Sequence, residues 1–198
     1  MAGNSSIKKL TRKVCRDRWL QKKDVPPVSI LPIEKWPQKW QDRIKAAKMV
    51  ACYMPIREEL RIRDLVGALQ KTGVKFCFPR VEGDVIAFYE VSEECALNQG
   101  KYGILEPGEM CNRVDPESID IMLIPATAYG RDGTRLGRGK GYYDKYVGNN
   151  RHGHSGAFTG HTIGVIPMEN LMGTVPSDTW DLKVSGICTE SAFIDVEG

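Results

Sequence analysis

Hydrophobic residues along the chain fall into helical and strand-like spacings that alternate from the N-terminus onward. The first helical pattern begins at Ser5 or Ser6, either of which can cap a helix, and runs to about residue 23. One face of this predicted helix is apolar and carries Ile7, Leu10, Val14 and Cys15. Lysines and arginines occupy the other face, so residues 5–23 predict a helix with a basic side.

Two further helices are predicted downstream, beyond a proline-containing connector. The first has apolar side chains at helical spacing, at Trp36, Trp40, Ile44 and Ala47. Pro37 is tolerated in the first turn of such a helix, and core packing is the expected role of both tryptophans. Residues 60–72 repeat the helical pattern, and Gly73 is a typical stop signal.

Short apolar runs between these helices predict strands. Residues 48–54 and 119–124 are almost continuously apolar, as in strands of a parallel sheet that are buried on both faces. The remaining candidates are a hairpin formed by 74–79 and 84–91, and single strands at 161–166 and 187–194. Residues 92–118 carry weak signals, and 102–108 predict a surface loop. We therefore expect an α/β fold, a three-layer αβα sandwich that is Rossmann-like with a mostly parallel central sheet.

Length and composition add a domain count. The 198 residues suffice for one full core but hardly for two, so we expect a single domain over residues 1–198. We also expect a monomer, which the length by itself does not establish. The hydrophobic fraction of 41% and charged fraction of 27% are ordinary for a globular protein. No apolar run approaches the roughly 20 residues that span a bilayer, so we expect no membrane partner.

The six cysteines show neither a CxxC pair nor regular spacing, and we interpret them as free thiols. The N-terminus lacks the apolar core and cleavage site of a secretory signal. Both observations favour a reducing, cytoplasmic location, with an organelle left open.

The net charge of +3 is mild and by itself implies no nucleic-acid partner, but the cations are concentrated in two places. One is the helix over residues 5–23. The other is the string Arg135-Leu136-Gly137-Arg138-Gly139-Lys140-Gly141-Tyr142-Tyr143-Asp144, which suits neither a strand nor a helix interior. Glycines beside cations let backbone amides approach an anion closely, so residues 130–144 predict a phosphate loop. A strand before it and a helix over 142–147 after it would place this loop at the carboxyl end of a sheet strand.

Two common phosphate motifs do not match this loop. A Walker A motif needs Ser or Thr after its Gly-Lys pair, but Gly139-Lys140 is followed by Gly141, and Thr134 stands where the first glycine is required. The dinucleotide fingerprint needs the spacing G-x-G-x-x-G, whereas Gly137, Gly139 and Gly141 are evenly spaced. A P-loop nucleotidase and a nicotinamide or flavin enzyme are therefore disfavoured.

The ten-residue string RLGRGKGYYD closely resembles the signature of the 5-formyltetrahydrofolate cyclo-ligases, also called methenyltetrahydrofolate synthetases. Shorter similarities follow in family order over most of the chain, at Lys8 with Arg12, Glu59 with Leu60, Pro79 with Arg80, residues 103–107, Val175-Pro176 with Asp181, and Thr189 with Glu190. The resemblance implies an enzyme that uses ATP and Mg²⁺ to convert 5-formyltetrahydrofolate into 5,10-methenyltetrahydrofolate, with ADP and phosphate as the other products. ATP would phosphorylate the formyl oxygen before the ring closes.

The resemblance also implies a role for individual residues. ATP would be bound by Lys8, Lys9, Arg12, Arg135, Gly137, Arg138, Gly139, Lys140 and Gly141. The folate would be bound by Met54, Glu59, Arg138, Gly139, Lys140, Gly141 and Tyr142, while Tyr143 could equally be a core residue. Arg138 and Lys140 would be catalytic, facing the transferred group or the formyl oxygen. Mg²⁺ would be bound by Asp144 and Asp181, with Asp178 an open alternative to Asp181.

Two other interpretations stay open at this point. Ala126, Gly130 and Ile62 depart from residues that are common in the family, which is compatible with a paralogue that binds folate but turns it over little. A nucleic-acid-binding module could use the basic helix and the Arg/Gly/Tyr loop, although the modest net charge argues against it. The H-x-H sequence at His152 and His154 lies in a glycine-rich stretch without a partner motif and indicates a surface segment rather than a metal site.

Overall fold

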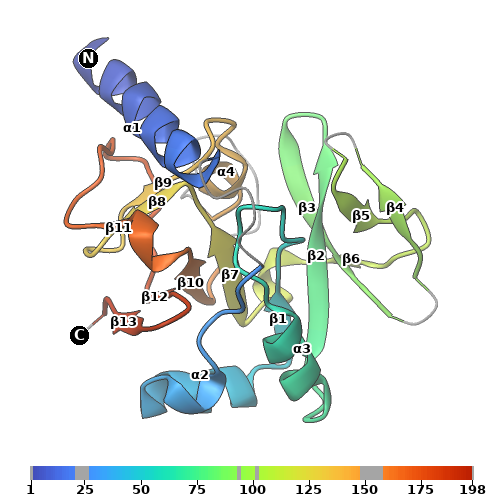
Figure 1. The fold of residues 1–198 in the computed structure, drawn as a ribbon. Helices are drawn as coiled ribbons and strands as arrows, with labels where there is room; N and C mark the ends of the chain where they lie inside the picture. The colour runs from blue at the N-terminus through green and yellow to red at the C-terminus, as the bar shows by residue number, and fades with distance from the viewer. Residues whose placement is uncertain (1, 21–26, 93–94, 101–102, 148–157, 198) are drawn as a thin grey trace.

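The computed structural model describes residues 2–20, 27–92, 95–100, 103–147 and 158–197 (Figure 1). Its centre is an eight-stranded sheet of order β13-β12-β10-β7-β1-β2-β3-β6. The strands are β1 Met49–Ala51, β2 Lys75–Glu82, β3 Val85–Glu90, β6 Arg113–Val114, β7 Ile121–Pro125, β10 His161–Val165, β12 Gly186–Cys188 and β13 Phe193–Asp195. The five strands from β12 to β2 are parallel, and antiparallel strands flank them. The predicted α/β class with a mostly parallel central sheet is confirmed.

The two strongest strand predictions form the middle of this sheet. Every residue of β1 and β7 is buried, and the two strands pair in parallel with Val50 opposite Ile121. Continuous apolar sequence is what this position requires, because helices or other elements cover both faces of a central parallel strand. The predicted hairpin is also confirmed, since β2 and β3 pair in antiparallel.

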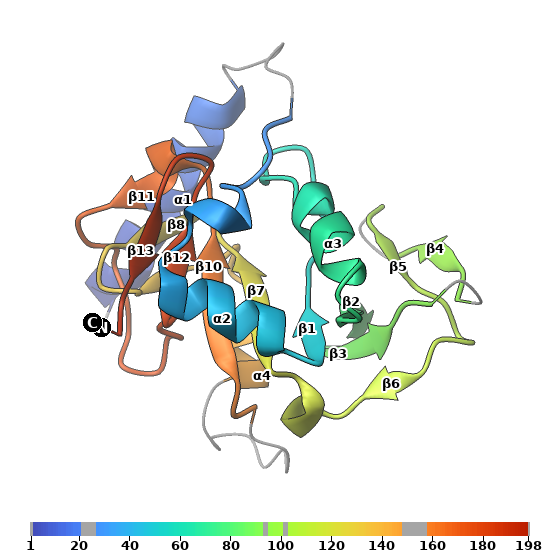
Figure 2. The same ribbon diagram turned by 90° about the horizontal axis from the view of Figure 1, so that it is seen from below.

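The helices are α1 Ala2–Leu20, α2 Gln38–Ala46, α3 Arg63–Gln70 and α4 Tyr142–Val147, with short 3₁₀ turns at Ile33–Lys35, Pro116–Ser118 and Met168–Asn170. Helices α2 and α3 cover one face of the sheet (Figure 2), where Trp40, Ile44 and Leu69 pack against strand residues. Helix α4 packs on the opposite face, beside Phe88 and Tyr129. This is the predicted layered arrangement, with α1 placed across the ends of the strands (Figure 1).

Several short strands were not predicted. Strands β4 Leu97–Gln99 and β5 Leu105–Pro107 form a hairpin where a surface loop is expected, and the single strand expected at 187–194 is the hairpin of β12 and β13. A second sheet has the order β11-β8-β9, and its strands are β8 Ala128–Gly130, β9 Arg135–Leu136 and β11 Leu171–Met172. These strands have two or three residues, too few to show an alternating pattern, and unlike β1 they do not lie within a longer apolar run.

The interpretation of all six cysteines as free thiols is wrong for two of them. Cys95 and Cys111 form a disulfide, with their Cα atoms 5.2 Å apart. These residues lie 16 positions apart and meet because the β4–β5 hairpin returns the chain to its starting point. The free cysteines of the described chain, Cys15, Cys52, Cys77 and Cys188, are all buried.

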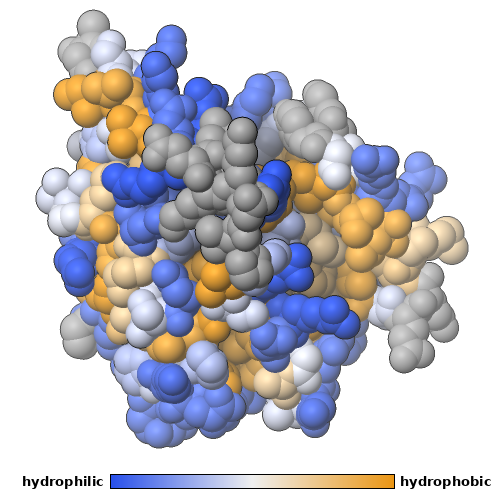
Figure 3. Space-filling model, in the orientation of Figure 1, coloured by the Kyte–Doolittle hydropathy of each residue, from blue (hydrophilic) through white to orange (hydrophobic). Residues whose placement is uncertain are grey.

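Helix α1 presents to the protein the opposite face from the one that its apolar residues indicate. Ile7, Leu10 and Val14 are 54%, 62% and 47% exposed, and Figure 3 shows apolar surface along this helix. Lys8 is instead buried, at 8% exposure, and Cys15, at 2%, is the one residue of the predicted apolar face that is buried. The expected end of this helix beyond Leu20, and the His152–His154 pair, lie outside the described residues. Within the described part of the chain, no helix has the length and apolar character needed to cross a membrane.

Candidate active site

The glycine-rich loop connects β9 to α4. The expectation that no part of the string from Arg135 to Asp144 forms a strand is wrong, because Arg135 and Leu136 form β9. Arg135 of β9 pairs with Tyr129 of β8, and β8 is the strand that follows β7 in the chain. Gly139 has a φ of 101°, a conformation that favours glycine. A Cβ atom on Gly137 would lie 2.6 Å from Nη1 of Arg135, so a larger residue would push this arginine aside.

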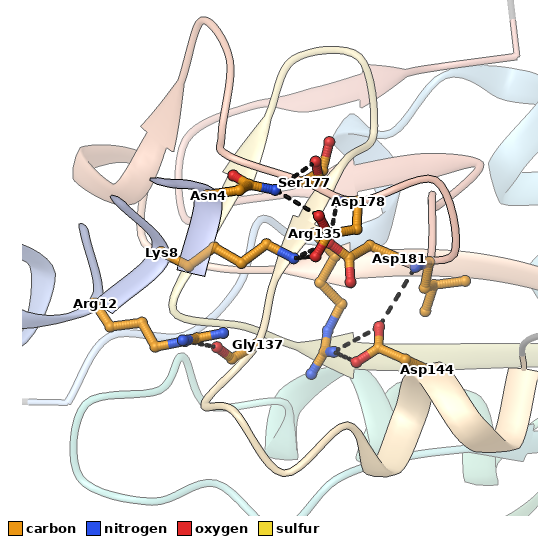
Figure 4. Close-up of polar contacts among 10 residues, drawn as sticks. Asn4, Lys8, Arg12, Arg135, Gly137, Asp144, Ser177, Asp178 and Asp181 are labelled. Carbon is orange, nitrogen blue, oxygen red and sulfur yellow. Dashed lines mark hydrogen bonds and ion pairs between the residues drawn. The ribbon is translucent and has the colours of Figure 1, made fainter. Parts of the chain in front are cut away.

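A small cavity of about 120 Å³ lies against this loop, under α1. It is lined by Lys8, Arg12, Arg135, Leu136, Gly137, Gly139, Gly141, Asp144 and Asp181. Three separate parts of the chain therefore meet here, and Figure 4 shows their polar side chains pointing toward one another. All of these residues except Leu136 were predicted to bind ATP or Mg²⁺, and we name this space the phosphate cavity.

Lys8 reaches across the phosphate cavity to the C-terminal segment (Figure 4). Its Nζ atom lies 2.6 Å from Oδ2 of Asp178 and 2.5 Å from Oδ2 of Asp181. Burial alone would lower the pKa of Lys8, but these two hydrogen bonds outweigh it and raise the pKa above its ordinary value. The hydrogen bond from Lys8 lowers the pKa of Asp178, which also accepts a bond from Nδ2 of Asn4. Four residues along α1, Nε of Arg12 donates to the carbonyl oxygen of Gly137 at 2.7 Å.

Arg135 is buried between the phosphate cavity and a larger neighbouring space. Its guanidinium donates to the carbonyl oxygen of Pro125 through Nε and Nη2, at 3.3 and 3.2 Å. Its Nη1 atom lies 3.2 Å from Oδ2 of Asp144, whose Oδ1 atom accepts from the backbone amide of Leu182 at 3.4 Å. This last contact brings Asp144 next to the segment that carries Asp181.

The neighbouring space has a volume of about 490 Å³, and we name it the folate cavity after the residues predicted to bind folate that line it. The predicted folate contacts that line it are Met54, Glu59, Arg138, Lys140, Gly141 and Tyr142. Tyr143, for which core packing was an equal expectation, lines it too. Its outer wall was not predicted and comes from β2, β3 and β5, through Pro79, Val81, Ile86, Ile104, Leu105 and Glu106. The family-like stretches at Pro79 and at residues 103–107 gave the sequence signal for that wall.

Glu59 is the buried acid of the folate cavity, with a side chain that is 11% exposed. Burial raises the pKa of its carboxyl group, and the nearby Arg138 partly opposes that effect. Nη2 of Arg138 lies 3.4 Å from Oε1 of Glu59 and 3.0 Å from Oε1 of Glu58. Glu58 was not singled out from the sequence, because an acid at the end of a loop is usually a solvated residue.

A third cavity, of about 560 Å³, lies on the other side of α1. It is lined by Ser6, Lys9, Leu10, Arg12, Lys13, Cys15, Arg16, Glu58, Ala126, Thr127, Arg138 and Asn170. Lys9 therefore lines this cavity and not the phosphate cavity. Arg12 is shared with the phosphate cavity and Arg138 with the folate cavity, so the three spaces surround one glycine-rich loop.

Comparison with known proteins gives consistent matches. A family model described as the 5-formyltetrahydrofolate cyclo-ligase family matches residues 7–190. The chain is 27% identical over 155 residues to the mouse 5-formyltetrahydrofolate cyclo-ligase, covering 74% of this chain and 75% of the relative. It is 28% identical over 162 residues to the enzyme of the same name from Mycolicibacterium smegmatis, covering 76% and 78%. The solved structure of Aquifex aeolicus 5,10-methenyltetrahydrofolate synthetase superposes with a TM-score of 0.72 at 28% identity, covering 97% of this chain and 94% of that one.

Proposed function

The chain belongs to the 5-formyltetrahydrofolate cyclo-ligase family, and we propose from this premise how its residues carry out the ATP-dependent closure of 5-formyltetrahydrofolate to 5,10-methenyltetrahydrofolate. The family makes the protein a ligase of folate metabolism with two small-molecule substrates. A cytoplasmic location and a monomeric state stay predictions.

The phosphate cavity is the proposed site for the phosphates of ATP. Lys8, Arg12 and Arg135 supply positive charge from two sides, and Gly137, Gly139 and Gly141 line the cavity without side chains. Phosphoryl transfer depends on positioning and on neutralising charge over the phosphate oxygens, so a cavity of cations and exposed backbone suits it.

The same cavity fits a magnesium ion bound together with the phosphates. Asp144 and Asp181 both line it and offer carboxylate oxygens, which Mg²⁺ prefers. No group of three or more His, Cys, Asp or Glu residues suited to a metal occurs in the described residues, and Mg²⁺ usually needs only one or two carboxylates beside phosphate and water. When bound, the ion would neutralise the charge that develops on the phosphates.

The folate cavity is the proposed site of the second substrate. Glu59 lies at its buried end and can accept hydrogen bonds from the amino and ring NH groups of the pterin, while Met54 and Tyr142 provide apolar contact. Arg138 and Lys140 line the same cavity from the glycine-rich loop and would face the formyl oxygen. Arg135 and Gly141 line both cavities, so the two reacting groups would meet over these residues.

In the proposed reaction, the formyl oxygen attacks the γ-phosphorus of ATP and ADP leaves, which forms a phosphate ester on the formyl carbon. The lone pair of N10 then attacks that carbon, N10 loses its proton, and the carbon–oxygen bond breaks to release phosphate. No side chain acts as a nucleophile in this scheme. Arg138 and Lys140 stabilise negative charge on the transferred group, as donors preorganised for a transition state do.

The observation that carries this proposal is the convergence of α1, the glycine-rich loop and the C-terminal acids on one cavity that adjoins the folate cavity. The test follows the absorbance of the methenyl product when the protein is mixed with 5-formyltetrahydrofolate, ATP and Mg²⁺. Lys140→Ala should lower kcat about 100- to 1,000-fold, as loss of one such donor does. Lys145→Ala is the matched control, because the side chain of this lysine donates only to the carbonyl oxygen of Asp84 among the bonds described, and alanine keeps its backbone bond to Gly141.

Two results would separate the alternatives. Absence of product from the unchanged protein, with folate still bound, would identify a folate-binding paralogue. Full activity of Lys140→Ala would remove that lysine from the reaction and leave the family assignment intact.

A further inference from the structure

Glu58 and Glu59 are adjacent acids that hold one side chain, Arg138, from two sides. Oε1 of Glu58 lies 3.0 Å from Nη2 of Arg138, and Oε1 of Glu59 lies 3.4 Å from the same nitrogen. Glu59 lines the folate cavity and Glu58 lines the third cavity, while Arg138 lines both. The proposed function uses Glu59 and Arg138 but gives no role to Glu58.

The turn that carries the two acids is fixed by its own hydrogen bonds. The backbone amide of Glu59 donates to the carbonyl oxygen of Ile56 at 3.0 Å, and the amide of Ile56 donates to Oε2 of Glu59 at 3.2 Å. The hydroxyl of Tyr53 donates to the carbonyl oxygen of Leu60 at 2.6 Å, which ties the end of the turn to the segment after β1. Arg138, by contrast, is 48% exposed on a loop where glycines flank it on both sides. Arg138 is therefore the member of the group that can most easily change its partner.

The free protein engages both carboxylate oxygens of Glu59. Oε1 accepts from Arg138 and Oε2 accepts from the amide of Ile56. The proposed pterin contact uses the same carboxylate, because the amino and ring NH groups donate side by side. Of the two contacts made by Arg138, the one with Glu59 is longer, so it is the weaker and the more easily displaced. Glu58 then offers the displaced guanidinium a charge-assisted hydrogen bond that it already makes.

We propose that Glu58 is a positioning residue of the cyclo-ligase reaction, which holds Arg138 beside the folate cavity while the pterin replaces this arginine on Glu59. The inference deepens the proposed function and rests on it for the place of the pterin. Glu58 thereby lowers the cost of separating Arg138 from Glu59 and raises the affinity for the folate. Arg138 stays at the boundary of the two cavities, where it would face the formyl oxygen.

The first experiment replaces Glu58 by Gln, which keeps the size of the side chain and removes its charge. Among the described ion pairs, Glu59 is then the one carboxylate left to Arg138, so the folate has to break a stronger pair. KM for the folate should rise about two- to fivefold, as expected for a partly exposed ion pair, and KM for ATP should not rise. Glu117→Gln is the matched control, because it removes the same charge from an exposed position of the 3₁₀ turn Pro116–Ser118 and should change neither KM.

The pH profile of the same variant gives a result that a purely structural role would not produce. Burial raises the pKa of Glu59, the charge of Arg138 lowers it, and the charge of Glu58 raises it. Glu58→Gln removes the last effect and strengthens the pair with Arg138, so the acid limb of kcat/KM for the folate should move to lower pH. The other titratable groups that line the folate cavity, none of which the substitution changes, are Tyr53, Glu106, Arg135, Lys140, Tyr142 and Tyr143.

A second variant tests whether the effect of Glu58 depends on Glu59. In a Glu59→Gln protein there is no ion pair for the folate to break, so adding Glu58→Gln should leave the affinity for 5-formyltetrahydrofolate, measured by equilibrium dialysis, unchanged. A further two- to fivefold loss would mean that Glu58 acts independently of that pair and would overturn the inference.

The outcomes also separate this inference from the proposed function. If Glu58→Gln forms the methenyl product with an unchanged KM for the folate, or with both KM values raised and the acid limb unmoved, the function stands and the inference is wrong. Absence of product from the unchanged protein would contradict both.

Discussion

At the scale of single residues, Lys8 occupies a position from which it would compete with the proposed metal ion. Its ammonium group lies within hydrogen-bonding distance of Asp178 and Asp181, and Asp181 is one of the proposed Mg²⁺ ligands. A divalent cation that approaches these oxygens is repelled by the resident positive charge. Bound ATP would draw Lys8 toward its phosphates, so metal binding and nucleotide binding should be coupled.

Replacing Lys8 by Met should therefore change two affinities in opposite directions. Without nucleotide, the affinity for Mn²⁺, used as a spectroscopic substitute for Mg²⁺, should rise about tenfold, while the affinity for ATP should fall. Free Mn²⁺ is measured by electron paramagnetic resonance with and without ATP. Lys13→Met removes the same charge from an exposed position of α1 and should leave nucleotide-free Mn²⁺ binding unchanged. A loss of Mn²⁺ binding in Lys8→Met alone would show that Lys8 does not compete with the metal.

Glu59 should make activity depend on pH. Burial raises the pKa of this carboxyl above its usual value of 4.5. Only the ionised form accepts pterin hydrogen bonds with both oxygens, so kcat/KM for the folate should fall as the pH drops through the raised pKa. Glu59→Gln should remove this acid limb and lower kcat/KM at all pH values. An unchanged acid limb in Glu59→Gln would assign the titration to another group.

The same raised pKa has a consequence for stability. The folded protein holds a proton on Glu59 more readily than the unfolded chain does, so this carboxyl favours folding at low pH and disfavours it as the pH rises through the folded pKa. Glu59→Gln should therefore raise the melting temperature at pH 7 relative to the unchanged protein, and lose that advantage in acid.

At the scale of elements, α1 shows why the burial of a helix cannot always be predicted from its apolar face. Ile7, Leu10 and Val14 form a regular stripe, but the helix docks through Lys8, Arg12 and Cys15. The partners of this polar face are acids and carbonyl groups more than a hundred residues away, which local periodicity cannot detect. The family resemblance predicts that Lys8 and Arg12 contact ligands. The spacing pattern was wrong for Ile7, Leu10 and Val14 and right for Cys15.

Replacing Leu10 by Gln tests this orientation of α1. Because Leu10 is 62% exposed, the change should alter the free energy of unfolding by no more than about 0.5 kcal/mol. Leu69→Ala in α3 is the comparison, since Leu69 is 2% exposed and its truncation should cost about 2 to 5 kcal/mol. Urea denaturation measures both. A cost for Leu10→Gln in the range of Leu69→Ala would mean that the apolar stripe is buried.

The β4–β5 hairpin forms a wall of the folate cavity and is closed by the Cys95–Cys111 disulfide. Opening a disulfide loop of this length lowers stability by about 3 kcal/mol in the chain-entropy account. The double variant Cys95→Ser/Cys111→Ser should therefore unfold more easily and show a higher KM for the folate, because Leu105 is less well fixed. The KM for ATP serves as the internal control and should not change, since the hairpin contributes no lining to the phosphate cavity.

The elements that the sequence located well lie in stretches with a distinctive local composition. The buried runs that became β1 and β7 and the tyrosine-rich turn that became α4 were all located within about two or three residues. The small sheet of β8, β9 and β11 was missed because pairing between distant short segments, and not local preference, stabilises it. That sheet is what holds Arg135 between two cavities, so the site depends on contacts that no single segment encodes.

At the scale of the whole molecule, one sheet separates two hydrophobic clusters and connects them through the same strands. Trp40 and Leu69 belong to the cluster under α2 and α3, and Phe88 belongs to the cluster under α4. Residues of β1 alternate between the two, with Val50 in the first and Ala51 in the second. Loss of either cluster therefore removes half of the packing of the central strands, and we expect the chain to unfold as a single cooperative unit.

This cooperativity can be measured with a probe on one face and a substitution on the other. Phe88→Ala should lower the free energy of unfolding by about 3 to 5 kcal/mol. Trp36 and Trp40 pack on the opposite face of the sheet. Because the two clusters share strands, the substitution should nevertheless lower the midpoint of the tryptophan fluorescence change. Far-ultraviolet circular dichroism should give the same midpoint as fluorescence, in both the variant and the unchanged protein. If fluorescence kept its original midpoint while circular dichroism separated into two transitions, the two faces would unfold independently and the expectation of one domain over residues 1–198 would be wrong.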